Sequence, residues 1–464
     1  MNPLTRKVIY TWASLGPRFL PFADAASPEM PLSRLLRLSL FQVSVGMALV
    51  LLIGTLNRVM IVELSVPASL VAIMLSLPLV FAPFRALIGF RSDTHRSFLG
   101  WRRVPFMWSG TLIQFGGLAI MPFALLVLAG EAEAADAPRW IGLAGAGIAF
   151  LMVGAGLHTT QTVGLALATD LAPPESQAKI VGLMYVMLLV GMIGSAIIFG
   201  ALLADFTPGR LIQVIQGSAV VTLILNVIAL WKQEARNPGR TAFHLPEPSF
   251  RESWGSFIEG EHALRRLAAL GLGTAAFSMQ DVLLEPYGGQ ILKLSVSATT
   301  TLTASLAFGG LVGFSYASRV LSRGTDPFRM ASNGALFGIP GFALVTLAAP
   351  LHAPALFALG VLLIGFGGGL FSHGTLTATM NLAPRDQVGL ALGAWGAVQA
   401  TAAGVAMALG GVMRDVVTSW AGPKGNGPML GYASVYALEI TLLLAAVVVM
   451  LPLLRRRGVA AQVV

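Results

Sequence analysis

The feature that most constrains this chain is a series of apolar runs, each about 20 residues long, that recurs from Leu38 to Leu454. A run of about 20 apolar residues is long enough to cross the hydrocarbon core of a bilayer as an α-helix. Only 11% of the residues are charged and 55% are hydrophobic, whereas soluble domains carry about 25% charged residues. The sequence therefore predicts an all-α integral membrane protein.

The apolar runs predict twelve membrane-spanning helices, here called spans 1 to 12. Their expected ranges are 38–60, 67–90, 104–129, 140–169, 179–204, 211–231, 264–285, 295–319, 330–349, 354–381, 388–412 and 431–454. The long polar stretch 232–263 separates two groups of six spans, and residues 249–260 within it are a candidate interfacial helix. The expected parts are an N-terminal segment 1–37, a first six-helix bundle 38–231, a linker 232–263, a second bundle 264–454 and a tail 455–464.

The distribution of positive charge predicts the orientation. If the N-terminus is cytoplasmic, all but six of the 30 Lys and Arg residues fall on the cytoplasmic side; the six are Arg58, Arg139, Arg210, Lys293, Arg414 and Lys424. The positive-inside rule then places both termini in the cytoplasm. The net charge of +9 reflects this topology and attraction to anionic lipid, so no nucleic-acid partner is expected. No cleavable signal peptide is expected, and the absence of cysteine excludes disulfides and thiolate-metal sites.

The two groups of spans resemble each other. After one deletion, residues 171–205 align with 382–415, and "LSVPASL" at 64–70 echoes "LSVSATT" at 294–300. The first alignment matches Gly194 with Gly404, Gly200 with Gly410 and Asp205 with Asp415. Two parallel repeats of six helices, joined by a long cytoplasmic loop, describe the architecture of the major facilitator superfamily.

The loop after span 2 supports this resemblance. The stretch "GFRSDTHRSFLGWRRVP" (89–105) resembles the signature of the superfamily between its second and third helices, with extra residues inserted; the matching residues are Gly89, Asp93, Arg96, Arg102 and Arg103. In the superfamily such a loop latches the two halves together on the cytoplasmic side. The alternative is an ordinary positively charged cytoplasmic loop.

In the superfamily fold, spans 1, 4, 7 and 10 line a central cavity, and the intramembrane polar residues of this chain concentrate on these spans. They are Asn57 and Arg58 with the following Glu63; His158, Thr159, Thr160 and Gln161; Gln280, Asp281 and Glu285; and His373 and Thr375. A charged side chain at the bilayer centre costs roughly 3 kcal/mol on insertion scales. Each charged position therefore needs a partner or a function.

Arg58 and Asp281 occupy matching places in the two repeats, in "TLNRVMIVE" and "SMQDVLLE". An ion pair between them would make both charges tolerable, and Glu285 would lie one turn further out, near the periplasmic mouth. One interpretation is structural, with the pair fixing helix register. The other is that Asp281 or Glu285 couples proton movement to transport.

Several segments together resemble the PucC/LhaA group, the bacteriochlorophyll-delivery branch of the major facilitator superfamily found in phototrophic purple bacteria. The resemblance runs from about residue 10 to the final span and is carried by "GPRFLPFADAAS", "RLLRLSLFQVSVGMA", "GTLNRVMIVEL", "APFRALIGFRSD", "GWRRVPFMWSG", "TQTVGLALATDLAP", "VIALWKQE" and "QDVLLEPYGGQ". It implies an assembly factor for photosynthetic light-harvesting complexes in the inner, intracytoplasmic membrane.

The implied partners are the antenna α and β polypeptides, membrane lipid, bacteriochlorophyll bound transiently and the synthase that makes it, with carotenoid as a second candidate pigment. His158 and His373 are the histidines within spans, and a neutral imidazole can serve as axial ligand to the pigment magnesium. Gln161 is a softer candidate. The alternative for both histidines is a hydrogen bond across helices.

Three functions remain open from the sequence. The first is delivery of bacteriochlorophyll to antenna polypeptides, and the second is a proton-coupled secondary transporter of a small solute. The third is a chaperone of antenna helices that binds no pigment. The chain contains no nucleotide-binding loop, no nucleophile–base pair and no metal-ligand spacing, so enzyme chemistry is not expected.

Overall fold

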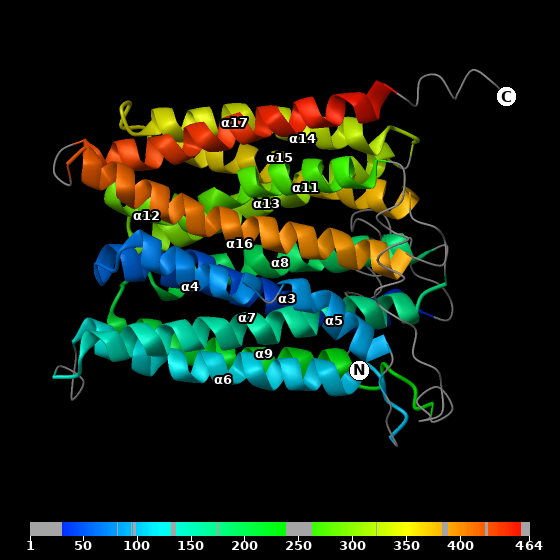
Figure 1. Cartoon of the computed structure of the whole chain (residues 1–464). Helices are drawn as coiled ribbons and strands as arrows, with labels where there is room; N and C mark the ends of the chain where they lie inside the picture. The colour runs from blue at the N-terminus through cyan, green and yellow to red at the C-terminus, as the bar shows by residue number, and fades with distance from the viewer. Residues whose placement is uncertain are drawn as a thin grey trace, which may run out of the picture.

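The computed structural model describes residues 30–80, 82–93, 95, 99–130, 136–173, 176–237, 262–321, 323–382, 388–422 and 426–455. All regular elements within these ranges are helical, which confirms the all-α prediction. The helices run side by side in one bundle (Figure 1). The candidate interfacial helix at 249–260 lies outside the described residues.

The first half contains spans 1 to 6. Span 1 consists of α2 (Leu32–Leu38), α3 (Leu40–Leu49) and two π-helical segments, η2 (Val50–Leu56) and η3 (Val59–Glu63). Span 2 consists of α4 (Ala68–Val80) and α5 (Ala82–Asp93), which lie end to end in Figure 1. Spans 3 to 6 are α6 (Val104–Ala129), α7 (Arg139–Asp170), α8 (Gln177–Leu202) and α9 (Pro208–Leu230).

The second half contains spans 7 to 12. Span 7 consists of α11 (Ala263–Ser278), a 3₁₀ turn η6 (Met279–Val282) and α12 (Leu284–Gln290). Spans 8 to 12 are α13 (Val296–Leu321), α14 (Pro327–Ala348), α15 (Pro354–Leu382), α16 (Val388–Trp420) and α17 (Gly427–Arg455).

Eleven of the described helices are long and apolar enough to cross a membrane. The twelfth expected span, 67–90, is the one divided between α4 and α5, so neither piece reaches that length alone. Three expected ends are wrong by five residues or more. Span 1 begins six residues earlier than expected, at Leu32, span 7 continues to Gln290, and span 11 continues to Trp420. Arg414 therefore lies within a helix and not in a loop.

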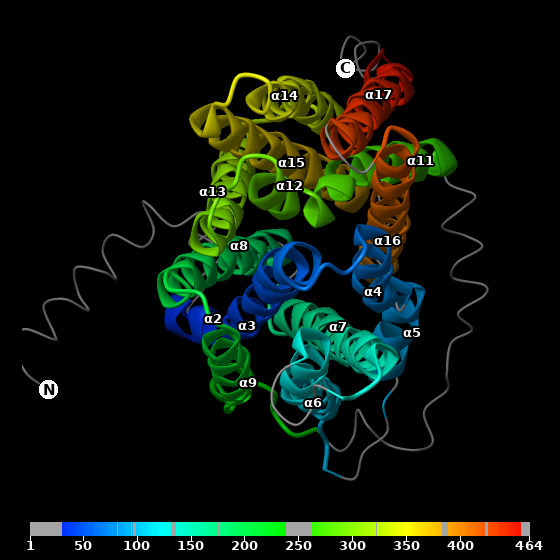
Figure 2. The same cartoon turned by 90° about the vertical axis from the view of Figure 1, so that its left-hand side faces the viewer.

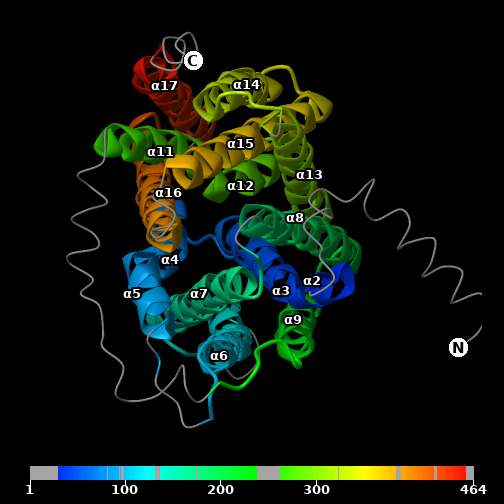
Figure 3. The ribbon, with the colours of Figure 1, turned by 90° about the vertical axis from the view of Figure 1, so that its right-hand side faces the viewer.

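The two halves meet along two helix pairs. In the end views, α8 lies beside α13, and α4 and α5 lie beside α16 (Figures 2 and 3). We call the end of the bundle where α9 ends and α11 begins the linker end, and the opposite end the far end. At the far end, the backbone N–H of Ser69 donates to Asp415 Oδ2 at 2.7 Å, and the hydroxyl of Ser297 donates to the Gly200 carbonyl at 2.7 Å. These two contacts join the halves at the far end.

Glycines bring α13 and α15 unusually close together. A Cβ added at Gly365 would lie 2.0 Å from the Leu306 carbonyl oxygen, and one at Gly313 would lie 2.3 Å from the Phe366 carbonyl oxygen. Small residues allow this approach, which supplies van der Waals packing where lipid gives no hydrophobic drive for helix association. The contact matters for function because α13 and α15 form one wall of the central cavities described below.

We expect Gly365→Ala to destabilise the bundle, because the added methyl group forces α13 and α15 apart. Overpacking of this kind typically costs about 1–3 kcal/mol. Gly194→Ala on α8 is the matched control, since a Cβ there meets nothing within 4 Å. Apparent unfolding temperatures in detergent check this, and equal temperatures for the two variants would contradict the expected clash.

Candidate functional site

The site is built around a break in span 7. Pro286 has no N–H and cannot donate to the carbonyl four residues earlier, that of Val282. The helix therefore changes to the 3₁₀ turn η6 just before Pro286. The free Val282 carbonyl accepts a hydrogen bond from Asn57 Nδ2 of span 1 at 2.9 Å. A buried amide from the first half thus stabilises an irregular backbone in the second half.

Two central cavities flank this break. The larger, of about 290 Å³, lies toward the linker end and is lined by residues that include Tyr185, Phe277, Phe314, Trp395 and Gln399. The smaller, of about 160 Å³, lies toward the far end and is lined by residues that include Ile53, Leu302 and Val361. Met192, Gln280, Asp281 and Leu306 line both cavities. The residues of the break thus stand between the two cavities.

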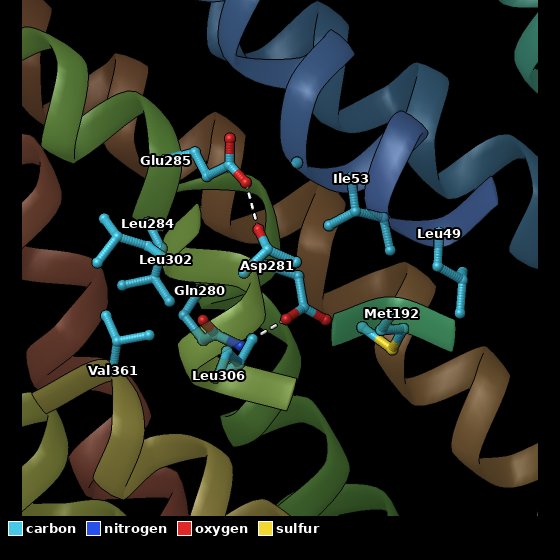
Figure 4. A pocket seen from close by; sticks show the side chains of 12 residues that line it. Leu49, Ile53, Met192, Gln280, Asp281, Leu284, Glu285, Leu302, Leu306 and Val361 are labelled. Atoms are coloured by element: carbon cyan, nitrogen blue, oxygen red, sulfur yellow. Dashed lines mark hydrogen bonds between the residues drawn. The ribbon is translucent and has the colours of Figure 1, made fainter. Parts of the chain in front are cut away.

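Asp281 is the charged group that faces both cavities. Its Oδ1 accepts a hydrogen bond from Gln280 Nε2 at 2.5 Å, and the same nitrogen donates to the Phe277 carbonyl at 3.0 Å (Figure 4). Among the described residues, no Lys, Arg or His side chain lies within ion-pair distance of Asp281. The site therefore presents a carboxyl group held by an amide and not balanced by a positive charge.

Glu285 lies deeper in the bundle than expected. Its side chain is 4% exposed, so the expected position near the periplasmic mouth is wrong. Its Oε1 accepts a hydrogen bond from the Thr303 hydroxyl of α13. A Cβ added at Gly54 would lie 2.4 Å from the same oxygen, so a larger residue at position 54 would require the Glu285 side chain to shift.

The expected ion pair between Arg58 and Asp281 is wrong. Arg58 Nη1 pairs with Glu63 Oε1 at 2.5 Å, and Nη2 donates to the Leu294 carbonyl at 3.4 Å. The Arg58 guanidinium also lies beside Gly289. That position is eight residues beyond Asp281, or about 12 Å along a helix. The two positions lie at a similar level, since Asn57 next to Arg58 donates to the Val282 carbonyl next to Asp281, but the Arg58 side chain extends toward the far end and away from Asp281.

None of the three pigment-ligand candidates lines either cavity. His158 on α7 and His373 on α15 are each 7% exposed, and neither lines a cavity. The His373 ring packs against Phe314, with centroids 4.2 Å apart. Gln161 accepts from Arg85 Nη2 at 2.9 Å and donates to Gln42 Oε1 at 3.3 Å, both within the first half.

The helices that line the cavities differ in part from the expected set. Spans 1, 7 and 10 contribute lining residues as expected, whereas span 4 contributes none to either cavity. Spans 5, 8 and 11 contribute the aromatic residues Tyr185, Phe314 and Trp395. The polar pattern of the sequence did not indicate these three lining residues, because an aromatic residue in a span looks like any other apolar residue of a membrane helix.

Two charged residues within spans were not singled out in the sequence. Glu439 of α17 is fully buried, and α17 packs against η6, the turn that carries Gln280 and Asp281. Arg85 of α5 donates to Gln161 and to the Thr162 hydroxyl. The sequence contained an indication of each residue. Glu439 is the one acidic residue in 431–454, and Arg85 is a charged residue inside the expected span 67–90.

The candidate gating loop makes its described contacts with the first half and with the start of the linker. Arg102 and Arg103 pair with Asp170 of α7 at 2.7 and 2.9 Å. The Glu234 carboxylate accepts from the backbone N–H groups of Arg102, Arg103 and Val104, and so caps the start of α6. Gly89 lies in α5. The Asp93 side chain and Arg96 lie outside the described residues, so a latch between the halves stays a prediction.

We expect energetic coupling between Arg58 and Glu63 and none between Arg58 and Asp281. Contacting residues typically couple by about 0.5–3 kcal/mol. Because Glu63 is 38% exposed, screening by water places this pair at the lower end of that range. Two double-mutant cycles of alanine variants, followed by thermal unfolding, measure both couplings. A larger coupling for Arg58 with Asp281 would contradict the observed pairing.

The described residues contain no group of three or more His, Asp or Glu side chains that could hold a bare metal ion. The break in span 7 instead places one accessible carboxyl group between two mainly apolar cavities. Such an arrangement suits a largely apolar ligand that needs a single polar anchor.

Solved structures similar to this chain are membrane transporters. A mutant form of the nucleoside transporter NupG superposes with a TM-score of 0.65 and 12% identity, over 90% of this chain and 99% of that one. A bacterial homologue of the iron transporter ferroportin in its outward-facing state gives a TM-score of 0.61 with 18% identity, over 90% of this chain and 98% of that one. At these identities the likeness concerns the fold, which is the major facilitator bundle.

Sequence comparison gives much closer relatives. Protein PucC of Rhodovulum sulfidophilum is 66% identical over 90% of this chain and 92% of its own length. Protein PucC of Cereibacter sphaeroides is 62% identical over 95% of this chain and 96% of its own length. A more distant relative, the bacteriochlorophyll synthase 44.5 kDa chain of Rhodobacter capsulatus, is 28% identical over 83% of this chain and 88% of its own length. The family model described as PUCC protein matches residues 55–458, and this chain therefore belongs to the PucC family.

Proposed function

We propose that this protein is an assembly factor for photosynthetic light-harvesting complexes that binds bacteriochlorophyll in its central cavities and delivers it to the antenna α and β polypeptides. Membership of the PucC family supports this, as does a distant relative named as a chain of bacteriochlorophyll synthase. The observation that carries the proposal is the larger cavity, which lies inside a membrane bundle between the two halves and is lined by four aromatic side chains.

The aromatic lining suits a flat, lipid-soluble ring. Tyr185 of the first half stacks near Phe314 of the second, with ring centroids 6.2 Å apart and an interplanar angle of 30°. Tyr185 meets Trp395 edge to face, with centroids 6.3 Å apart. Such rings offer faces and edges for stacking on another conjugated ring. Because these contacts join the two halves, separation of the halves would open this wall of the cavity.

The size of the cavities adds a requirement. The larger cavity, at about 290 Å³, is near the lower limit of about 300 Å³ for sites that enclose a drug-sized ligand. A pigment with a long hydrocarbon tail therefore needs the halves to move apart or must leave its tail in lipid. We propose that loading and release occur through such movement, in the intracytoplasmic membrane and with both termini in the cytoplasm.

We expect the gently purified protein to carry bacteriochlorophyll, visible in its near-infrared absorption spectrum. Tyr185→Ala and Trp395→Ala should each weaken pigment binding by up to about tenfold, since one aromatic contact contributes about 0.5–1.5 kcal/mol. Trp420→Ala is the control, because Trp420 is 89% exposed at the far end of α16. A colourless protein that copurifies with antenna polypeptides would instead support a chaperone that binds no pigment.

A second function, proton-coupled transport of a small solute, has one specific observation in its favour. Asp281 and Glu285 line the smaller cavity. No described basic side chain lies within ion-pair distance of either residue. Unbalanced carboxyl groups inside the membrane mark proton pathways in transporters. The fold itself allows both functions and does not choose between them.

We expect no solute-driven proton uptake in proteoliposomes that contain this protein, tested with water-soluble metabolites added one at a time. If uptake appeared, was abolished by Asp281→Asn or Glu285→Gln, and survived in Glu63→Gln, transport would replace pigment delivery as the better proposal. Glu63 is the matched control because it is an acid that already has an ion-pair partner in Arg58.

A further inference from the structure

We propose that Asp281 is the residue that binds the magnesium of the pigment, through the carboxylate oxygen Oδ2, and that Gln280 is the positioning residue that holds this carboxylate in place. The inference rests on the proposed function, because it names the ligand contact within the same cavities. It replaces the histidines expected from sequence with an oxygen donor at the break of span 7.

The position of Asp281 is the first argument. It is the charged residue that lines both cavities, and its side chain is partly exposed there. A ring seated against Tyr185 and Trp395 in the larger cavity would therefore have this carboxyl group at its edge or face. His158, His373 and Gln161 line neither cavity, and Phe314 lies between the His373 ring and the larger cavity.

The orientation of the carboxyl group is the second argument. Gln280 is 2% exposed, and its Nε2 is engaged by both Asp281 Oδ1 and the Phe277 carbonyl. In Figure 4 the amide nitrogen of Gln280 points to one Asp281 oxygen, and the other oxygen points toward the side of Met192. That second oxygen, Oδ2, accepts no hydrogen bond from any described residue and keeps its lone pairs for a ligand.

The chemistry of magnesium is the third argument. Mg²⁺ is a hard cation that prefers oxygen donors, and carboxylates are its usual protein ligands. Four ligands of a pigment magnesium come from the ring itself, so a single axial donor from the protein is sufficient, in keeping with the absence of a three-residue metal cluster among the described residues. The ring is a dianion, so the pigment is neutral overall, and its magnesium would act on Asp281 as a Lewis acid that accepts a lone pair of Oδ2.

The other carboxyl groups near the break are less suited. Glu285 is 4% exposed, and its Oε1 is held by the Thr303 hydroxyl. Glu439 is fully buried in α17 and lines neither cavity. Gln399 lines the larger cavity, but its amide oxygen is a weaker donor to magnesium than a carboxylate oxygen. Asp281 is therefore the donor that combines access, charge and a fixed orientation.

The experiment compares two probes that differ only in the metal: bacteriochlorophyll and its magnesium-free analogue. Each is titrated in detergent against the purified full-length chain, and binding is followed by quenching of tryptophan fluorescence. Wild type should bind the magnesium form more tightly. Asp281→Leu should bind both forms equally. In Gln280→Leu the ratio of the affinity for the magnesium form to that for the magnesium-free form should be about tenfold smaller than in wild type, as is typical when a group that orients a metal ligand is removed.

Two further variants keep the test independent of folding defects. Asp281→Asn is nearly isosteric, but the Gln280 N–H would hold its oxygen and turn its NH₂ group toward the cavity, so it should also lose the preference. Gln399→Leu removes a polar side chain from the same cavity and should keep it. Size-exclusion profiles and unfolding temperatures confirm that each variant is folded.

The outcomes separate the inference from the proposed function. A magnesium preference that persists in folded Asp281→Leu and Asp281→Asn overturns the inference but leaves pigment binding intact. If His158→Leu or His373→Leu loses the preference for the magnesium form while the Asp281 variants keep it, the ligand is a histidine and the inference is overturned. Failure of wild type to bind either probe overturns the proposed function and the inference together.

Discussion

The hydrogen bond from Asn57 to the Val282 carbonyl is the interaction on which the centre of this protein depends. Pro286 leaves that carbonyl without its helical donor, and a free carbonyl in a membrane interior is costly. Asn57 of the first half supplies the missing donor at 2.9 Å, so span 7 can turn at Met279–Val282 instead of continuing as a helix. This turn places Gln280 and Asp281 between the two cavities and ties the two halves together at the same point.

The charges of the bundle are arranged unevenly around that point. Toward the far end, Arg58 pairs with Glu63, and Arg414 pairs with Asp415 while also donating to Gln290. At the centre, Asp281, Glu285 and Glu439 have no described cation within ion-pair distance. Each of these ion pairs lies within one span and neutralises its charge locally, and Arg414 links α16 to span 7 through Gln290, whereas carboxyl groups without a paired cation in a membrane protein indicate a function that uses them. The far end thus has mainly structural charges, and the centre has the candidate functional ones.

Apolar packing completes the site. The glycines of α13 and α15 allow a close approach of these helices, and residues of both helices line the larger cavity. The aromatic lining residues Tyr185 and Trp395 come from different halves and meet edge to face. A cavity built in this way changes shape when the halves move, which a factor that must both take up and release a lipid-soluble cargo requires. The PucC family membership and the major facilitator fold are both consistent with that requirement.

The sequence by itself determined the number of spans, most of their ends to within four residues, the all-α class and the family, because apolar length and charge are local properties read along one chain. It also indicated the polar residues of span 7, since Asp281 and Glu285 stand out against an apolar background. Only the tertiary structure decided the partner of Arg58, the burial of Glu285 and the exclusion of His158 and His373 from the cavities. These depend on how far each helix is displaced along and rotated about its axis relative to its neighbours, which the packing of side chains from distant segments sets.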